Sequence, residues 1–280
     1  MPSIADKRRE FRRLHESGCF VIPNPWDIGT TRYLQHLGFK ALATTSLGYA
    51  FSQGRADNAV PRDMMLAHIA EIVSAADVPV NADFEGGYAD DPEGVAESVR
   101  LCVQTGVAGL SIEDSTGNKD KPLYDFDHAL ARIKAARKAI DDTAPDVLLT
   151  ARSEGFIRGR PDLTETIRRL QAFAEAGADC LYAPGIKTRE EITAVVQAVA
   201  PKPVNLLMGW AGDFTVGELG ALGVRRISVG GALARAAWGG FIRAARQIAI
   251  GGSFSGFSDA APAADLNALF GDDLKRRSAP

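Results

Sequence analysis

The stretch VPVNADFEGGY, residues 78–88, joins an apolar run to a strongly polar end. Asn81, Asp83 and Glu85 stand at alternate positions in it, and two glycines follow. Alternate residues of a β-strand point to the same side. The stretch therefore predicts a buried strand whose end carries several polar groups on one face.

Short apolar runs rich in strand-forming residues recur along the whole chain. They occupy residues 19–24, 41–46, 78–84, 109–114, 146–154, 179–185, 203–209 and 225–231. Between them apolar residues recur at helical spacing, as in residues 30–39, 91–106, 127–140, 162–177 and 188–200. Eight strand-helix units of this kind predict a (β/α)8 barrel of the TIM type. An open, doubly wound sheet is the alternative, which the count of eight strands disfavours.

The pattern predicts a single domain, with the barrel over residues 1–250. Residues 251–262 are rich in Gly and Ser and contain two aromatic residues, and residues 263–270 (AADLNALF) have a short helical pattern. A short apolar helix on a flexible tether needs a surface to pack on. We therefore expect the tail, residues 251–280, to pack on its own barrel or on a neighbouring subunit.

Composition and charge exclude several classes of protein. The 280 residues are 46% hydrophobic and 24% charged, and a formal net charge of −3 favours neither nucleic acid nor an anionic membrane. No apolar run reaches the roughly 18 residues that span a bilayer, and residues 1–18 lack the apolar centre of a secretory signal. We expect a cytoplasmic enzyme, with Cys19, Cys102 and Cys180 as core residues.

Acidic residues follow several of the expected strands. In a parallel barrel the carboxyl ends of the strands meet at one mouth, so Asp83 and Glu113 are expected to converge there, with Glu85 and Asp57 as further candidates. Carboxylates packed together repel one another unless a cation neutralises them, and a hard divalent cation is the usual partner of oxygen ligands. The residues predict a Mg²⁺ site, although each carboxylate alone could equally cap a helix or pair with an arginine.

Six motifs, in order, resemble those of the isocitrate lyase/phosphoenolpyruvate mutase superfamily. They are NPWD (24–27), ATTS (43–46), NADFEGGY (81–88), SIED (111–114), TAR (150–152) and PVN (203–205). The resemblance implies a barrel that depends on Mg²⁺, or on Mn²⁺, and cleaves C–C or P–C bonds of small carboxylic acids through an enolate. It also implies a homotetramer, a dimer of dimers that exchange the last barrel helix.

The resemblance also implies roles for individual residues. It matches Asp83, Glu113, Glu85 and Asn81 to the metal site, and Arg152, Lys119 and Asp57 to the catalytic groups. It matches Thr45, Ser46, Leu47, Asn118, Arg152 and Asn205 to the substrate-binding site. The superfamily pattern is Asp-x-Asp-x-Gly, and we place Asn81 at its first Asp and Glu85 at its Gly. Glu85 is then expected to restore the lost charge through a metal-bound water.

Two segments depart from the superfamily. Residues 115–125 (STGNKDKPLYD) have the Gly and Lys content of a mobile lid but lack the cysteine of isocitrate and methylisocitrate lyases. Pro184 and Gly185 follow the sixth strand, where relatives have a glutamate or a histidine. The first difference argues against a true isocitrate or 2-methylisocitrate lyase. The second favours a reaction that needs little general-acid help, such as decarboxylation or retro-aldol release of a 2-oxo acid.

We therefore expect a lyase or decarboxylase of a small 2-oxo or hydroxy acid. A phosphonopyruvate-type hydrolase or mutase is one alternative, because superfamily members of that kind use a lysine and an asparagine in the lid, as Lys119 and Asn118 could be used here. A non-catalytic protein that binds a 2-oxo acid such as 2-oxoglutarate or pyruvate is another. The missing lid cysteine motivates this second alternative.

Overall fold

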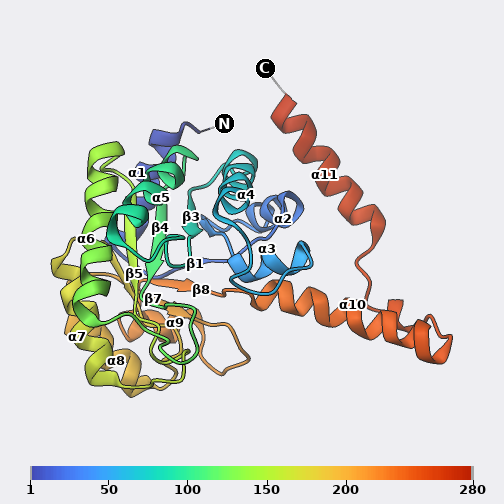
Figure 1. The fold of residues 1–280 in the computed structure, drawn as a ribbon. Coiled ribbons are helices and arrows are strands. Elements are labelled where there is room, and N and C mark those ends of the chain that lie inside the picture. Colours follow the sequence, from blue (N-terminus) through green and yellow to red (C-terminus); the bar gives the residue numbers. More distant parts are fainter. Residues whose placement is uncertain (1, 279–280) are drawn as a thin grey trace.

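The computed structural model describes residues 2–278, in which eight parallel strands are surrounded by helices (Figure 1). The strands are β1 (Phe20–Ile22), β2 (Leu42–Ala43), β3 (Val80–Asp83), β4 (Gly109–Glu113), β5 (Leu148–Arg152), β6 (Cys180–Tyr182), β7 (Val204–Leu207) and β8 (Arg226–Ser228). The helices are α1 (Ile4–Glu16), α2 (Ile28–His36), α3 (Ser46–Ser52), α4 (Arg62–Ala75), α5 (Pro92–Gln104), α6 (Phe126–Thr143), α7 (Leu163–Glu175), α8 (Arg189–Val199), α9 (Val216–Ala221), α10 (Ala232–Gly251), the 3₁₀ turn η1 (Ser255–Phe257) and α11 (Ala263–Ser278). Each strand predicted from the sequence is present.

The strands form a nearly closed ring. They pair in the order β1-β8-β7-β6-β5-β4-β3-β2, and every pair is parallel. At the remaining seam the Ala43 N–H donates to the Pro23 carbonyl at 3.1 Å, which brings the end of β1 to β2. The (β/α)8 barrel is thus confirmed, and the open, doubly wound sheet is excluded.

The strands separate an apolar outer face from a polar inner face. On β4, Leu110 and Ile112 are fully buried in the core shared with the helices, whereas Ser111 and Glu113 line a pocket inside the barrel. Burial of apolar surface contributes about 25 cal/mol per Å², so the outer faces supply much of the stability. The inner faces can then carry polar groups that do not contribute to the core.

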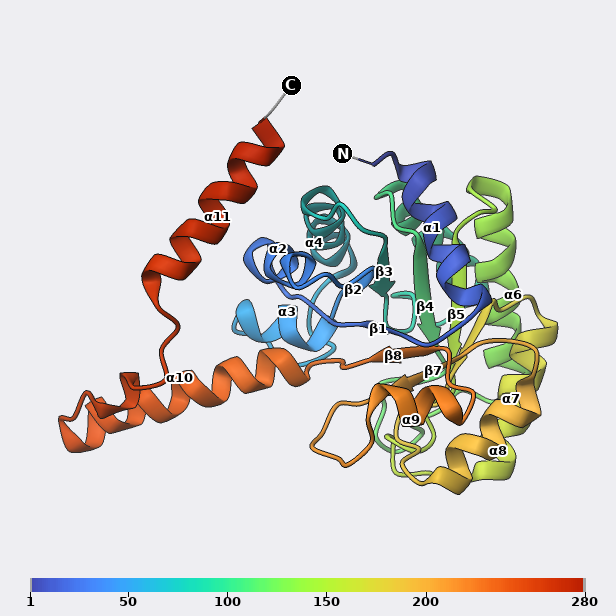
Figure 2. The same ribbon diagram turned by 180° about the vertical axis from the view of Figure 1, so that it is seen from behind.

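Helix α1 covers the amino-terminal end of the barrel, opposite the mouth (Figure 2). Arg8 Nε donates to the Val107 carbonyl at 3.0 Å and Arg12 Nε to the Asp146 carbonyl at 3.2 Å, and both acceptors precede a strand. The Phe11 side chain has no exposed surface and packs in a small core below the mouth. The amino-terminal segment is therefore an integral floor of the barrel.

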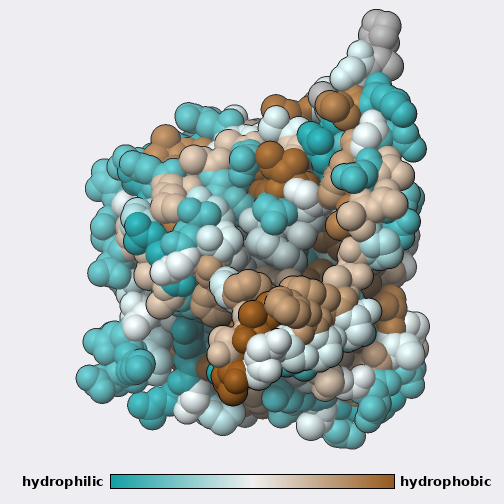
Figure 3. Space-filling view, turned by 90° about the vertical axis from the view of Figure 1, so that its right-hand side faces the viewer, coloured by the Kyte–Doolittle hydropathy of each residue, from teal (hydrophilic) through white to brown (hydrophobic). Residues whose placement is uncertain are grey.

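The carboxy-terminal part of the chain leaves the barrel (Figures 1 and 2). Helix α10 projects outward and ends at Gly251, and the next residue, Gly252, has a φ of 59°, the left-handed conformation that commonly ends helices. Among its residues only Ala234 is buried, whereas Phe241 is 62% and Ile250 85% exposed. Figure 3 shows apolar side chains gathered over this projecting part.

The tail helix α11 begins at Ala263, as predicted, but runs to Ser278 instead of ending at residue 270. Acid–base pairs one turn apart, such as Asp273 with Arg277 at 2.8 Å, extend it. The helix returns to its own barrel, where Asp273 pairs with Arg32 at 3.3 Å and Arg277 with Asp77 at 2.9 Å. A single chain does not test whether a helix is exchanged between subunits.

The expectations for the cysteines and for membrane-spanning segments can be compared with the structure. Cys102 and Cys180 are buried and Cys19 is half-buried, and all are free thiols, in agreement with the packing role expected for them. Within residues 2–278, the helices are all too short or too polar to cross a lipid bilayer.

We predict that Gly109→Ala destabilises the lower part of the barrel. A Cβ at this position would lie 2.7 Å from Phe11 Cε1, 2.9 Å from Asn81 Oδ1 and 3.1 Å from the Leu148 carbonyl oxygen. Overpacking of this kind typically costs about 1–3 kcal/mol. Urea denaturation should show a loss of that size in the free energy of unfolding.

The matched control is Gly217→Ala, on helix α9. A Cβ there meets no atom within 4 Å, so the substitution should leave stability unchanged or raise it by up to about 1 kcal/mol, the difference in helix propensity. Equal free energies of unfolding for the two variants would contradict the prediction.

Candidate active site

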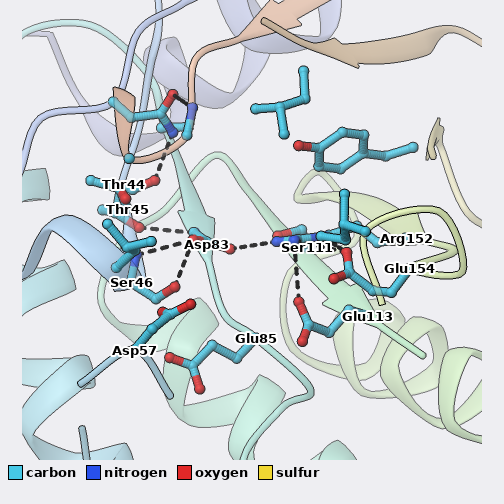
Figure 4. A pocket seen from close by; sticks show the side chains of 18 of the residues that line it. Thr44, Thr45, Ser46, Asp57, Asp83, Glu85, Ser111, Glu113, Arg152 and Glu154 are labelled. Atoms are coloured by element: carbon cyan, nitrogen blue, oxygen red, sulfur yellow. Dashed lines mark hydrogen bonds and ion pairs between the residues drawn. The ribbon is translucent and has the colours of Figure 1, made fainter. Parts of the chain in front are cut away.

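A pocket of about 190 Å³ opens at the carboxyl ends of the strands (Figure 4). Polar groups from β2 to β5 meet in it, as expected for a parallel barrel. The charged residues that line it are Asp57, Asp83, Glu85, Glu113, Arg152, Glu154, Arg158 and Arg226. Apolar side chains, among them Leu47, Ile157 and Leu207, form the remaining wall.

Asp83, the last residue of β3, is held by groups from two directions. Its Oδ2 accepts from the Ser46 N–H at 3.0 Å and from the Ser46 hydroxyl at 2.9 Å. Its Oδ1 accepts from Arg152 Nη1 at 2.7 Å. Figure 4 shows the carboxylate between these two residues, so its orientation is fixed by the protein alone.

Arg152, the last residue of β5, forms ion pairs with three carboxylates. The distances are 2.7 Å to Asp83, 3.2 Å to Glu113 and 2.8 Å to Glu154. Arg158 approaches Glu113 at 3.2 Å and Glu154 at 3.4 Å. Burial, and then the Glu154 charge, still raise the pKa of Glu113 well above its usual range, although both arginines oppose this effect. The two guanidiniums therefore neutralise the cluster only in part.

Glu85 lies two residues beyond Asp83, in an unusual backbone conformation. Its φ of 48° is left-handed, which costs a residue other than glycine roughly 1–2 kcal/mol. The side chain is only 9% exposed, and burial, followed by the charges of Asp83 and Asp57, raises the pKa of its carboxyl to about 7. Local strain of this kind is typical of functional sites.

The donor set fits a hard divalent cation. Five carboxylates and three guanidiniums line the pocket, which leaves a formal charge of −2. Within residues 2–278, no three His, Cys, Asp or Glu side chains converge closely enough to hold an ion unaided. Mg²⁺ usually keeps several waters and takes only one or two carboxylates from the protein, so the residues present are compatible with it.

Several residues predicted for the substrate site do lie in the pocket. Thr45 caps helix α3, where its hydroxyl accepts from the Gly48 N–H at 3.2 Å. Ser46 follows it and holds Asp83, and Leu47 lines the wall. Asp57 lies on the exposed rim.

Asn118 and Lys119 lie outside the pocket. Both are exposed at the tip of the segment after β4, and the Asn118 side-chain oxygen accepts from the Asp120 N–H at 2.9 Å. An isolated bridge between Ser115 and Leu123 closes the base of this segment. The segment is thus a compact turn, and its two predicted residues do not touch the other site groups.

Two predicted asparagines lie deeper than the carboxylates. Asn81 is 3% exposed and its side-chain nitrogen donates to the Ala82 carbonyl at 3.1 Å, while its Oδ1 has no hydrogen-bond partner in the protein. Asn205 is 1% exposed, and its Oδ1 accepts from Arg226 Nε at 2.8 Å. Both belong to a polar layer below the mouth.

Sequence reasoning missed two charged residues of the pocket, Arg158 and Arg226. Glu154 lies two residues after Arg152, at the end of the same strand. Arg158 lies in a turn without helical or strand periodicity, and Arg226 is the first residue of β8, at the end of that strand away from the mouth. Neither gives a local signal. Asp114, the last residue of the SIED motif, accepts from the Glu154 N–H at 2.8 Å and pairs with Arg169 of α7 at 3.1 Å, and it does not line the pocket.

Tyr182, the last residue of β6, lines the pocket, whereas Gly185 after it is packed against its neighbours. Gly185 has a φ of 102°, and a Cβ there would lie 2.7 Å from Ile157 Cγ2 and 2.8 Å from Phe156 Cβ. Residue 185 is the position after β6 where relatives have a glutamate or a histidine. Here the side chains of Ile157 and Phe156 fill the space beside it. A larger side chain at residue 185 would not fit this arrangement.

Comparisons with known proteins agree with this geometry. The chain matches the family described as phosphoenolpyruvate phosphomutase over residues 11–249. A solved structure from Burkholderia cenocepacia J2315, described as a candidate lyase/mutase, is 51% identical, with a TM-score of 0.93 over 96% of this chain and 97% of its own. An oxaloacetate decarboxylase from Paraburkholderia xenovorans (strain LB400) is 32% identical over 218 residues, 73% of this chain and 69% of the relative.

A solved phosphonopyruvate hydrolase, in complex with oxalate and Mg²⁺, is 26% identical, with a TM-score of 0.84 over 97% of both chains. The family match extends over most of the chain and includes the strands that carry Asp83, Glu113 and Arg152. This protein therefore belongs to the phosphoenolpyruvate mutase family, within the isocitrate lyase/phosphoenolpyruvate mutase superfamily.

Proposed function

We propose that this protein is a Mg²⁺-dependent carbon–carbon lyase or decarboxylase that acts on a small 2-oxo or hydroxy carboxylic acid through an enolate. The charge of the pocket is the observation that carries the proposal, because five carboxylates face three guanidiniums. The excess of acidic groups adds to the effect of burial in raising the pKa values of Glu85 and Glu113, and a divalent cation would relieve this excess. The oxaloacetate decarboxylase among the relatives supports this class of reaction.

Asp83 and Glu113 are the residues that would hold the cation, with Glu85 and Asp57 beside them. Such an ion, Mg²⁺ or Mn²⁺, polarises a substrate oxygen and offsets negative charge that develops on it. Asp83 is already oriented by Ser46 and Arg152, so little reorganisation is needed for binding. Its carboxylate can accept about four hydrogen bonds or ligands, and three of these positions are used within the protein.

Arg152 is the residue that we assign to the substrate carboxylate or the developing enolate. Its Nε and Nη2 donors face Glu154 and Glu113, and one Nη1 donor faces Asp83, which leaves one Nη1 N–H for a substrate oxygen. Three ion pairs fix its position before a substrate arrives. A donor fixed in this way stabilises charge as it develops, and its loss typically slows an enzyme about 10²–10³-fold.

The hydrocarbon beside Gly185 limits the chemistry available at that wall. Ile157 and Phe156 occupy the space next to this glycine, so residue 185 has no room for an acid–base side chain. Decarboxylation, or retro-aldol release of a simple 2-oxo acid, needs less general-acid assistance than cleavage of isocitrate. We therefore favour these two reactions.

We propose a revised register for the metal motif. The pattern Asp-x-Asp-x-Gly can begin at Asp83, with Glu85 as its second acidic residue and Gly87 as its glycine. Gly87 has a φ of 76°, and a Cβ there would lie 3.2 Å from Val95 and 3.3 Å from Ile112. In this register both acidic positions lie at the mouth, and Asn81 is a residue of the layer below.

Asn118 and Lys119 would reach the substrate only if the segment after β4 moved. In the structure their segment is folded on itself and exposed. Gly117, with a φ of 74°, precedes them and has no atom within 4 Å of a would-be Cβ. We propose that these two residues approach a bound anion when the segment closes as a lid.

We also propose a homotetramer in which α10 and the tail bind a second copy of the chain. Helix α10 exposes Trp238, Phe241 and Ile242, and the segment after it exposes Phe254. Exposed apolar patches of this kind usually mark an interface. In such an assembly the tail would pack across the subunit boundary, as a pair of exchanged helices.

We predict that the purified protein with Mg²⁺ converts one member of a panel of oxaloacetate, 2-methylmalate, 2,3-dimethylmalate and phosphonopyruvate, followed by NMR. Chelation with EDTA should abolish the reaction and added Mg²⁺ should restore it. Asp83→Ala should lose activity, because it removes the carboxylate that fixes both Ser46 and Arg152. Asp63→Ala, which changes an exposed acid of α4 outside the pocket, is the control.

Full turnover by Asp83→Ala would overturn the metal assignment. Tight Mg²⁺-dependent binding of a 2-oxo acid without conversion of any panel member would identify a binding protein and overturn the catalytic proposal. Release of phosphate from phosphonopyruvate as the only reaction would replace the lyase with a P–C hydrolase.

We predict that replacing Phe241 and Ile242 together by lysine dissociates the assembly. The pair is 62% and 41% exposed on α10, and charges there should prevent apolar packing. Light scattering coupled to gel filtration should show a tetramer for the wild type and a smaller species for the variant. Leu37→Lys, at a side chain 56% exposed on the end of α2, is the control and should stay tetrameric. A monomeric wild type would refute the assembly.

A further inference from the structure

We propose that Arg226 is a buried cation whose charge favours binding of the substrate anion, although it lies below the groups assigned to the reaction. The proposal rests on the proposed function in one respect, that the ligand of the mouth is a small carboxylate. It assigns a role to a residue that neither the metal site nor the reaction uses.

Arg226 is held in the polar layer under the mouth. It is the first residue of β8, is 2% exposed, and contributes to the lining of the pocket. Its Nε donates to Asn205 Oδ1 at 2.8 Å and its Nη2 to Thr150 Oγ1 at 2.9 Å. Its Nη1 lies 3.3 Å from His15 Nε2, on helix α1.

These three partners are electrically neutral. Asn205 and Thr150 carry no charge, and the protonation of His15 follows from its neighbours. The His15 Nδ1 lies 2.7 Å from the Phe11 carbonyl, which can only accept, so Nδ1 carries the proton and Nε2 accepts from Arg226. Burial, and then the charge of Arg226, lower the pKa of His15 to about 3, which keeps the ring neutral at physiological pH.

Arg226 therefore differs from the other two arginines of the pocket. Arg152 and Arg158 are each paired with buried carboxylates, whereas all three polar partners given for Arg226 within residues 2–278 are uncharged. A buried charge without a counterion is strongly unfavourable. Charges also act over longer distances in the protein interior than in water. The field of this guanidinium is thus available to an anion that enters above it.

An electrostatic role of Arg226 can be distinguished from a structural role, because its charge has opposite effects on an anion and on a cation. Loss of the positive charge should weaken binding of an anion, and should leave unchanged or strengthen binding of Mg²⁺. A general loss of packing would weaken both ligands together. Measuring the two ligands separately therefore distinguishes electrostatic action from support of the fold.

The experiment is calorimetric titration of the full chain with Mg²⁺ alone, and then with oxalate at saturating Mg²⁺. Arg226→Met removes the charge, and Asn205→Asp neutralises it in place, because an Asp oxygen can keep the 2.8 Å contact to Nε. Both should weaken oxalate binding roughly tenfold, the order of magnitude expected for loss of one charge that acts through an effective dielectric constant near 20, without weakening Mg²⁺ binding. Arg226→Lys should stay within about threefold of the wild type.

Arg225→Met is the matched control. It removes the same charge from the neighbouring residue, whose guanidinium donates to the Gly18 carbonyl away from the pocket. This variant should bind both ligands like the wild type. A similar loss of oxalate affinity in Arg225→Met would attribute the effect to net charge and overturn the proposal.

The remaining outcomes are also decisive. Parallel weakening of Mg²⁺ and oxalate in Asn205→Asp, or unchanged oxalate binding in that folded variant, overturns the role of Arg226 and leaves the proposed function intact. If Arg226→Met does not fold, Asn205→Asp still decides the question. Failure of the wild type to bind both Mg²⁺ and oxalate contradicts the proposed function itself.

Discussion

The guanidinium of Arg152 connects the ends of three neighbouring strands. It pairs with Asp83 at the end of β3, with Glu113 at the end of β4 and with Glu154 just after β5. Without it, three carboxylates in a buried mouth would repel one another. The ion pairs offset that repulsion. They also add side-chain contacts between strands that are joined by backbone hydrogen bonds. The positions of Asp83, Glu113 and Glu154 depend on these ion pairs.

Two features of the site destabilise the folded protein, and apolar packing elsewhere in the barrel offsets this cost. Glu85 holds a left-handed backbone conformation, and Arg226 is buried without a counterion. The outer faces of the strands and the floor under α1 bury apolar residues such as Leu110, Ile112 and Phe11 completely. Because inner and outer faces alternate along each strand, the unfavourable groups do not interrupt the core. The barrel can therefore support a charged interior.

The fold and half of the site could be predicted because their signals are local. Strand and helix periods are visible over a few residues, and they gave the eight strands with the correct positions. Asp83, Glu113 and Arg152 end three of these strands, and parallel topology alone brings them together. The tail was less predictable, because the extra turns of α11 depend on ion pairs such as that between Asp273 and Arg277.

The rest could not be predicted because it depends on contacts between distant parts of the chain. Arg226 and His15 are 211 positions apart, and only the folded barrel shows that the partner of this arginine is neutral. The sequence gives the number of charged residues but not their pairing. A net charge of −3 therefore does not show which arginines are neutralised by a carboxylate. The field inside the pocket is set by the pairing of each charge. An arginine held by Asn205, Thr150 and a neutral His15 keeps a field that Arg152, with three carboxylates, has lost.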